Sequence, residues 1–519
     1  LTKTVHYIDG PLNTDSKIYL SVASGKTNGA ELLRPSGGYT IAPGDVKKLF
    51  FTNTSAGYEA ILSSDGSVIL SLPHRHTLCN RTTHTGAGHS DSCGTSITFE
   101  EWTDAAAQTM YPGTGAKAAN CLPTEGDWYL TQSVTLTATH VVDNKTLNLC
   151  LGGYSVALNA EGAVFSVKSD GVLNLTDCQG TSCGSITHGS DFSGAGVSVE
   201  AGSDETVAGT FNLYNGKITG NNNLSGNGGG VSVFSDGQFN MYGGSITNNK
   251  AATGGGVYVN DNATVTISGG TITDNEATSD GGGMTVENCQ VTLSGKVTIT
   301  GNKSTDGKSS NLYIKGGQGV TLDKNFNFSS KVVFKDCDNQ YDGTYYISNA
   351  NALDNTKLAC FTTDAGRKFV KAGDDNVYVA TVLEDNQMPT VYKDLKYNGT
   401  EQTGVKVPNG AEKYYTITDG TTEATQANTA SQGGEKYTAV VTLKPGYALY
   451  HTNTYYVTAT PLNLYWRIEP KKAAASDFVV TSTLTTTYNE KYHGVTVTVA
   501  EQYTKNSENW KDKLEVQYQ

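Results

Sequence analysis

The feature of the sequence that most constrains its fold is an internal repeat. A Gly-Val-x-Val pattern and its variants begin at Gly196, Gly230, Gly256, Gly283 and Asn311, at intervals of 34, 26, 27 and 28 residues. Each period holds three short segments in which apolar and polar residues alternate, and each segment is too short to bury a face alone. Because every strand then needs its equivalent in the next period as a partner, the pattern predicts an all-β chain centred on a right-handed parallel β-helix. Leucine-rich repeats would need a regular leucine spacing that is absent here.

The repeat also predicts which side chains point inward. Three columns of apolar residues should stack along the coil: Val197, Val231 and Val257; Phe211, Phe239, Val265 and Val291; Ile218, Ile246, Ile272 and Ile299. One asparagine lies three residues after each of these isoleucines, at Asn221, Asn249, Asn275 and Asn302. Asparagine tolerates the left-handed conformation of a turn, and its amide can bond to the same amide one turn on. We therefore expect a structural asparagine ladder.

The sequence divides into five expected regions. Residues 1–73 alternate weakly and predict a small β domain, and residues 74–124 form a His/Cys-rich connector and cap. The alternation of the β-helix extends over residues 125–387, with its last turn near Val382. Residues 388–469 and 470–519 predict C-terminal modules of the β-sandwich or grasp type, the second of them truncated. The high glycine count of 59 against 11 prolines suits short strands with polar turns.

Two sets of motifs resemble known families. Val391-Tyr392, Tyr397–Gln402, Tyr437–Tyr447 and Leu464–Ile468 occur in the order found in MBG-type β modules, which are tandem modules of bacterial surface proteins. Pro470 begins what resembles a second copy. A second series resembles the large cell-surface β-helix proteins of gut Firmicutes over residues 74–470; it comprises His74-Arg75-His76, Thr98–Trp102, Asp127–Thr131, Leu147–Leu151, Leu175–Cys178 and the glycine-rich repeats. In that family the histidine motif commonly leads into Cys-x-Cys-Gly, whereas here Cys79 is followed by Asn80.

These resemblances imply an extracellular protein on the bacterial cell surface, with an adhesin-like function. Its partners would be a host glycan, mucin or a host protein such as immunoglobulin. The chain starts at Leu1 and ends in a strand-like pattern, so we expect native termini, and any anchor, outside it. We expect a monomer.

Charge and hydropathy exclude two classes of partner. The chain has 37 Lys and Arg against 50 Asp and Glu, a formal net charge of -13. Such a charge repels phosphate backbones, so the sequence predicts no nucleic-acid binding. No apolar run approaches the roughly 18–20 residues that a membrane-spanning helix needs, which predicts no membrane insertion of this segment.

The densest group of potential metal ligands lies in the connector. His74, His76, Cys79, His84, His89 and Cys93 fall within 20 residues. Four of these imidazole and thiolate groups could close around one structural zinc ion. Their spacing matches no standard zinc finger, so a Cys79–Cys93 disulfide is an alternative, and the absence of either cross-link is a third.

An enzyme is the alternative to a binding protein. A β-helix can carry a glycoside hydrolase or a polysaccharide lyase, but fold alone says little about function. Of the five arginines, only Arg367 lies within residues 125–382, which disfavours an arginine-based lyase. The best candidates for paired catalytic carboxylates are Asp177, Asp191, Asp204 and Glu205, although acidic residues are common in turns without any catalytic role. The lack of a complete catalytic set favours binding.

Four tyrosines are the candidate ligand-binding residues. Tyr214 and Tyr242 occupy equivalent positions 28 residues apart, and Tyr258 and Tyr313 are expected to point outward from the first strand of their repeats. Exposed aromatic rings can stack on sugars or anchor a protein interface, although tyrosine is also common in strands without a binding role. The strand alternation predicts one flat, uncharged strip along the coil, made of Ser198, Ser232, Tyr258, Thr285 and Tyr313.

Overall fold

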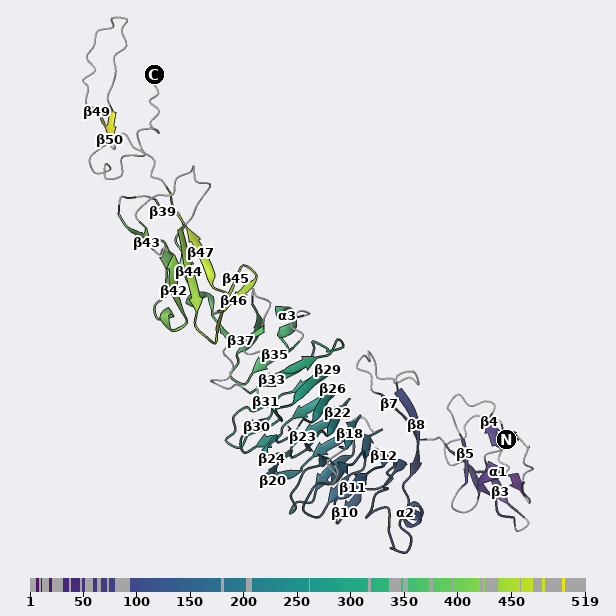
Figure 1. Ribbon diagram of the computed structural model, residues 1–519. Coiled ribbons are helices and arrows are strands. Elements are labelled where there is room, and N and C mark those ends of the chain that lie inside the picture. Colours follow the sequence, from purple (N-terminus) through teal and green to yellow (C-terminus); the bar gives the residue numbers. More distant parts are fainter. Residues whose placement is uncertain are drawn as a thin grey trace, which may run out of the picture. The chain divides into compact units, whose positions relative to one another are not determined.

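The computed structural model describes residues 94–469 except 179–181, 202–207, 261, 316–318, 336–346, 349–352, 373–376, 394, 397, 399, 421–422, 425–436 and 458. Outside these limits it describes short strands and a few further residues. The described residues form an all-β protein with a large, mainly parallel sheet, as the sequence predicts (Figure 1). Among these residues, three short α-helices interrupt the strands: α1 (Pro43–Val46), α2 (Asp104–Met110) and α3 (Asn355–Leu358).

The parallel sheet is built from three columns of strands, in which each strand pairs with its counterpart one repeat further on. We call residues 126–363 the parallel-strand repeat; the strands can be followed in Figure 1. The first column contains β9 (Gly126–Tyr129), β12 (Thr146–Cys150), β15 (Val172–Thr176), β18 (Thr210–Leu213), β22 (Gln238–Met241), β26 (Thr264–Thr273), β29 (Gln290–Ile299) and β32 (Val320–Leu322).

The other two columns pair in the same way. One contains β11 (His140–Asp143), β14 (Phe165–Lys168), β17 (Val197–Val199), β21 (Val231–Val233), β25 (Val257–Val259), β28 (Met284–Glu287) and β31 (Leu312–Lys315). The last contains β10 (Val134–Leu136), β13 (Val156–Leu158), β16 (Ser185–His188), β19 (Lys217–Thr219), β23 (Ser245–Thr247), the second halves of β26 and β29, β33 (Lys331–Phe334) and β35 (Phe361–Thr363). This arrangement is compatible with a β-helix.

The core of the parallel-strand repeat consists of the predicted apolar columns. Phe211 pairs with Phe239, and their rings stack at a centroid distance of 5.3 Å. Ile218, Ile246, Ile272 and Ile299 also follow one another in register and are at most 1% exposed. The predicted inward columns are therefore confirmed. Each of these residues pairs with its equivalent one repeat further on, so the hydrophobic stabilisation is spread along the parallel-strand repeat.

The predicted asparagine ladder is also confirmed. The side-chain Nδ2 of Asn221 donates to Oδ1 of Asn249, and the series continues through Asn275 and Asn302 to Asn311 with N–O distances of 2.9–3.1 Å. The ladder starts at His188, whose Nδ1 lies 2.8 Å from Oδ1 of Asn221. It ends where Nδ2 of Asn311 donates to Oδ1 of Asp364. All five asparagines are at most 1% exposed, so these bonds satisfy polar groups that water does not reach.

We expect the substitution Asn275→Ala to lower the free energy of unfolding by about 3 kcal/mol or more. Oδ1 of Asn275 accepts from both the backbone N–H and Nδ2 of Asn249, and all these groups would lose their buried partner. Chemical denaturation followed by circular dichroism measures the change. Asn222→Ala, on an exposed side chain two repeats earlier, is the matched control and should change stability by about 0.5 kcal/mol or less. Equal effects of the two substitutions would contradict the role of the ladder.

The prediction that this strip of residues is exposed is wrong, although the predicted alignment of its residues from repeat to repeat is right. Ser198, Ser232, Tyr258, Thr285 and Tyr313 pair in one column. However, Ser232 and Tyr258 are each only 4% exposed and Thr285 is completely buried. Glycine corners fold back over this face: Gly254 adopts a φ of +63°, and a Cβ there would lie 2.9 Å from the Cβ of Tyr258. Tyr258 is therefore not an exposed binding residue. The alternation of apolar and polar residues in the sequence cannot reveal such a cover.

Tyr313 is also partly covered. The Nζ of Lys335 lies 5.3 Å from the centre of its ring and pairs with the carboxylate of Asp280. A separate small parallel sheet contains β20 (Asn222–Asn227), β24 (Lys250–Thr253), β27 (Glu276–Ala277) and β30 (Lys303–Ser304).

The described chain separates into two compact units near Gly366. The next two strands, β36 (Lys368–Lys371) and β37 (Val377–Val382), pair antiparallel, and β37 then pairs with β45 (Tyr447–His451). The repeat therefore ends at β35, earlier than the predicted last turn near Val382. Alternation in sequence is the same for parallel and antiparallel strands, which explains the error.

The second unit has a core of its own around an antiparallel sheet of β42 (Tyr415–Gly420), β44 (Tyr437–Leu443) and β47 (Leu462–Trp466). Gly404 packs directly on the ring of Trp466, leaving no space for a side chain. Its remaining strands are β38 (Thr390–Val391), β39 (Leu395–Lys396), β40 (Gln402–Thr403), β41 (Val405–Lys406), β43 (Glu423–Ala424), β46 (Thr454–Tyr456) and β48 (Ile468–Glu469). Of residues 470–519, the structure describes only the antiparallel pair β49 (Phe478–Val480) and β50 (Val497–Val499).

The described residues before residue 74 are mainly short strands, in line with the expected β domain. They are β1 (His6–Ile8), β2 (Ile18–Leu20), β3 (Glu31–Pro35), β4 (Leu49–Phe51), β5 (Glu59–Leu62) and β6 (Val68–Ser71), around a small core that includes Ile41 and Val68. Among the described residues of the chain, no helix is long and apolar enough to cross a membrane.

Candidate metal centre

Two histidines reach the parallel-strand repeat from a hairpin. The strands β7 (His74–Cys79) and β8 (Gly94–Glu101) pair antiparallel, and the end of β8 pairs with β9 at the start of the repeat. Alternate residues of a strand share one face, so His74 and His76 point to the same side of β7. The hairpin therefore presents two imidazoles together.

Two cysteines lie on neighbouring turns of the repeat. Cys150 is the last residue of β12, where it pairs with Thr176, the last residue of β15. Cys178 follows two residues later. Cys150 is completely buried, whereas Cys178 is exposed.

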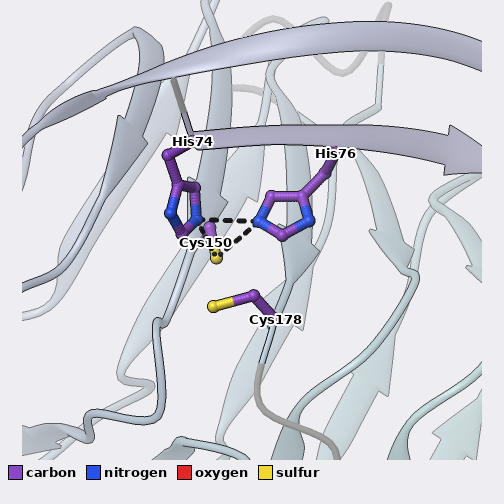
Figure 2. Close-up of side chains that lie close together, drawn as sticks. All are labelled: His74, His76, Cys150 and Cys178. Atoms are coloured by element: carbon purple, nitrogen blue, oxygen red, sulfur yellow. Dashed lines mark hydrogen bonds between the residues drawn. The ribbon is translucent and has the colours of Figure 1, made fainter. Parts of the chain in front are cut away.

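The four side chains converge on one point (Figure 2). The Nε2 atoms of His74 and His76 are 2.7 Å apart, and they lie 3.1 and 3.2 Å from Sγ of Cys150. One ligand atom from each of His74, His76, Cys150 and Cys178 lies within 4.8 Å of every other. We call these four residues the His/Cys cluster.

Burial keeps the two imidazoles in the form that binds metals. Burial, together with the neighbouring His76, lowers the pKa of His74 to about 4, against an opposing effect of the Asp177 carboxylate. Burial also lowers the pKa of His76, again opposed by Asp177. Both rings are therefore neutral at pH 7, with lone pairs available for a metal. Burial and the adjacent Cys178 raise the pKa of Cys150, so binding of a metal to this sulfur would release a proton.

Aromatic residues hold the imidazoles in place. The ring of Tyr129 stacks on His74 at a centroid distance of 4.2 Å and an interplanar angle of 8°. Phe99 meets His76 edge to face at 5.3 Å. Leu78 and Phe99 of the hairpin pack with Cys150 in a small apolar cluster, against which Tyr129 and Tyr214 also lie. Such packing orients metal ligands before an ion binds.

No protein-family model, curated protein or solved structure matches this chain. The chemistry of the site is therefore argued from its geometry.

The donor set and its dimensions fit a tetrahedral ion. Zinc bonds of about 2.0–2.1 Å to nitrogen and 2.3 Å to sulfur place ligand atoms about 3.3–3.8 Å apart. The observed separations of 2.7–3.2 Å are slightly shorter, so side-chain rotations that separate these atoms by roughly half an ångström would accommodate the ion. Two imidazoles and two thiolates fill all four positions of a closed, structural site.

The sequence predicted half of this cluster. His74 and His76 belong to the predicted set, and their proximity is confirmed. Cys150 and Cys178 were missed, although Cys178 lies only two residues beyond Thr176, the partner of Cys150 one repeat further on. Cys79 lies in β7, but its side chain is outside the described residues, as are His84, His89 and Cys93. The alternative Cys79–Cys93 disulfide thus falls outside them too.

Asp177, a candidate catalytic residue, holds a backbone turn in place instead. It is 4% exposed, and its Oδ2 accepts the backbone N–H groups of Gly153 and Gly184 at 3.1 and 2.8 Å. These bonds fix the turn that carries Cys178. Asp191 is exposed, and Asp204 and Glu205 lie outside the described residues, so no catalytic pair is seen among those described.

We expect Asp177→Ala to weaken zinc binding by about tenfold to a hundredfold. The substitution leaves two backbone N–H groups without their acceptor and loosens the turn before Cys178. Asp177→Asn keeps one acceptor oxygen and should have a smaller effect. Competition with a chromophoric chelator measures both affinities, and equal affinities for the parent and Asp177→Ala would contradict the positioning role.

Proposed function

We propose that the His/Cys cluster binds one structural zinc ion, which fastens the hairpin β7–β8 to the parallel-strand repeat. The observation that carries this proposal is the convergence of two neutral imidazoles and two sulfur atoms within 4.8 Å. A cross-link of this kind is useful at the start of the repeat, because an open stack of strands exposes its first edge.

The zinc-fastened coil is a right-handed parallel β-helix that serves as a rigid rod in an extracellular protein of the bacterial cell surface. The sequence resemblance to adhesin-like proteins of gut Firmicutes supports this function, with MBG-type modules as a stalk. The rod displays a binding face to a host glycan, mucin or a host protein such as immunoglobulin. Of the four candidate catalytic carboxylates, Asp177 accepts two backbone N–H groups and Asp191 is exposed, so we propose binding in preference to hydrolysis.

The first column of strands offers the better binding face. Its outward row of half-buried amides, formed by Asn148, Asn174, Asn212 and Asn240, is joined by side-chain hydrogen bonds of 2.6–2.9 Å. At the edge of this row the rings of Tyr214 and Tyr242 stack at 4.9 Å. Fixed amides and aromatic rings suit the hydroxyl groups and apolar faces of sugars. This face replaces the covered strip around Tyr258.

Metal analysis tests the zinc site directly. Protein prepared without chelator should contain about one zinc per chain, as a tetrahedral His₂Cys₂ site requires. The double variant His74→Ala/His76→Ala should contain none, whereas His451→Ala, at an exposed position of the second unit, should retain it. Unchanged zinc content in the double variant would overturn the assignment.

Binding of labelled host glycans and proteins tests the proposed face. The variants Tyr242→Ala and Asn240→Ala should weaken binding, while Tyr465→Ala, on an exposed ring of the second unit, should not. Release of a sugar product during the assay would instead support a hydrolase.

A further inference from the structure

The His/Cys cluster takes a different kind of ligand from each of the two parts that it joins. Both ligands from the hairpin are histidines, and both ligands from the parallel-strand repeat are cysteines (Figure 2). Only sulfur ligands are readily oxidised under mild conditions. A reaction between the two sulfur atoms therefore removes every ligand that the repeat contributes and leaves β7 without a metal link to the repeat.

The two sulfur atoms are placed for such a reaction. Their Sγ atoms lie within 4.8 Å of each other, on adjacent turns of the repeat. A disulfide needs an S–S distance of about 2.05 Å, which rotation of the exposed Cys178 side chain can approach. Cys150, by contrast, is held in the apolar cluster with Leu78 and Phe99.

We propose that the His/Cys cluster is a redox-controlled latch, in which a hydroperoxide joins Cys150 to Cys178, releases the zinc and unfastens the hairpin. This inference rests on the proposed zinc site and adds its regulation. An extracellular setting makes it relevant, because thiols outside the cell meet oxidants.

Cys178 is exposed and Cys150 is buried, so Cys178 reacts first. The thiolate of Cys178 attacks one oxygen of the hydroperoxide, the O–O bond breaks, and the sulfur becomes a sulfenic acid while an alkoxide or hydroxide leaves. The thiolate of Cys150 then attacks this sulfur, so that the S–S bond forms and hydroxide leaves. Two protons from solvent neutralise the leaving groups. Two electrons pass from the thiolates to the peroxide, and both zinc–sulfur bonds are lost.

The structural consequence is confined to the hairpin. The disulfide would join β12 to the turn after β15, and both belong to the parallel-strand repeat. The end of β8 stays paired with β9, and β7 keeps its pairing with β8, the apolar contacts of Leu78 and the stacking of His74 on Tyr129, but it loses the metal link. We therefore expect β7 to open more often, exposing Tyr129 and Tyr214.

Hydrogen peroxide added to the zinc-loaded full chain tests this inference. The expected result is release of one zinc per chain, a Cys150–Cys178 disulfide in a peptide mass map, and amide exchange in β7 about tenfold faster. A dithiol reductant with added zinc should restore the starting state. The variant Cys183→Ser should respond like the parent, because Cys183 lies outside the cluster.

The outcomes of this experiment distinguish a failure of the proposed zinc site from a failure of the proposed latch. A chain that binds no zinc even after reconstitution would overturn the proposed metal site. A chain that binds zinc but keeps it, with both thiols still open to alkylation after peroxide treatment, would overturn the latch and leave the metal site standing. A Cys178–Cys183 disulfide, or release of zinc without faster exchange in β7, would also overturn the latch.

Discussion

Replacing Ile246 with aspartate is expected to lower the free energy of unfolding by about 4 kcal/mol or more. Ile246 is completely buried between Ile218 and Ile272 of the neighbouring turns, so the carboxylate would have neither water nor a cation nearby in the column. Thermal unfolding followed by circular dichroism measures the loss. Failure of the variant to fold at all would be the extreme form of the same result.

Two further variants are controls for this prediction. Thr247→Asp introduces the same charge one residue later, on a half-exposed side chain, and should change stability by about 0.5 kcal/mol or less. Ile246→Val removes one methylene and should cost about 0.5–1.5 kcal/mol. If the two aspartate variants melt at the same temperature, the inward column has been assigned to the wrong residues.

Removal of zinc is the second large effect that we expect. An ion that binds only the folded chain stabilises it by about 2.7 kcal/mol when its free concentration is a hundred times its dissociation constant. A chelator should therefore lower the melting temperature of the zinc-loaded protein. Cys150→Ser should produce the same loss without chelator, because it removes a buried ligand of the cluster.

The decisive comparison combines the two treatments. Chelator should not destabilise Cys150→Ser further, since the ion is already absent. Cys121→Ser, at a free cysteine outside the cluster, should keep the full response to chelator. If chelator lowers the melting temperature of Cys150→Ser as much as that of the parent protein, the ion acts at another site.

The repeat made much of the fold predictable. Its period and alternation identify the inward columns, and the position of Asn249 and its equivalents after the isoleucines predicts the ladder. These inferences depend only on neighbours one turn apart, which the sequence spacing specifies directly.

Two of the failures concern contacts that no spacing encodes. The burial of Tyr258 comes from a corner at Gly254 that folds over the strand, and the alternation of the strand is the same with or without that cover. Cys150 lies 74 residues from His76 in sequence, so only the pairing of the hairpin with β9 brings them together. The proximity of His74 and His76 was predictable because both lie on one strand face.

The direction of the asparagine ladder affects how such a protein can change in length. Every internal asparagine receives hydrogen bonds at Oδ1 from the turn before it and donates one from Nδ2 to the next asparagine. A duplicated repeat would therefore find matching groups on both sides, and only the ends, at His188 and Asp364, require partners of another kind. Recombination between repeats can thus lengthen or shorten the parallel-strand repeat by whole periods while leaving the bonds of the ladder intact.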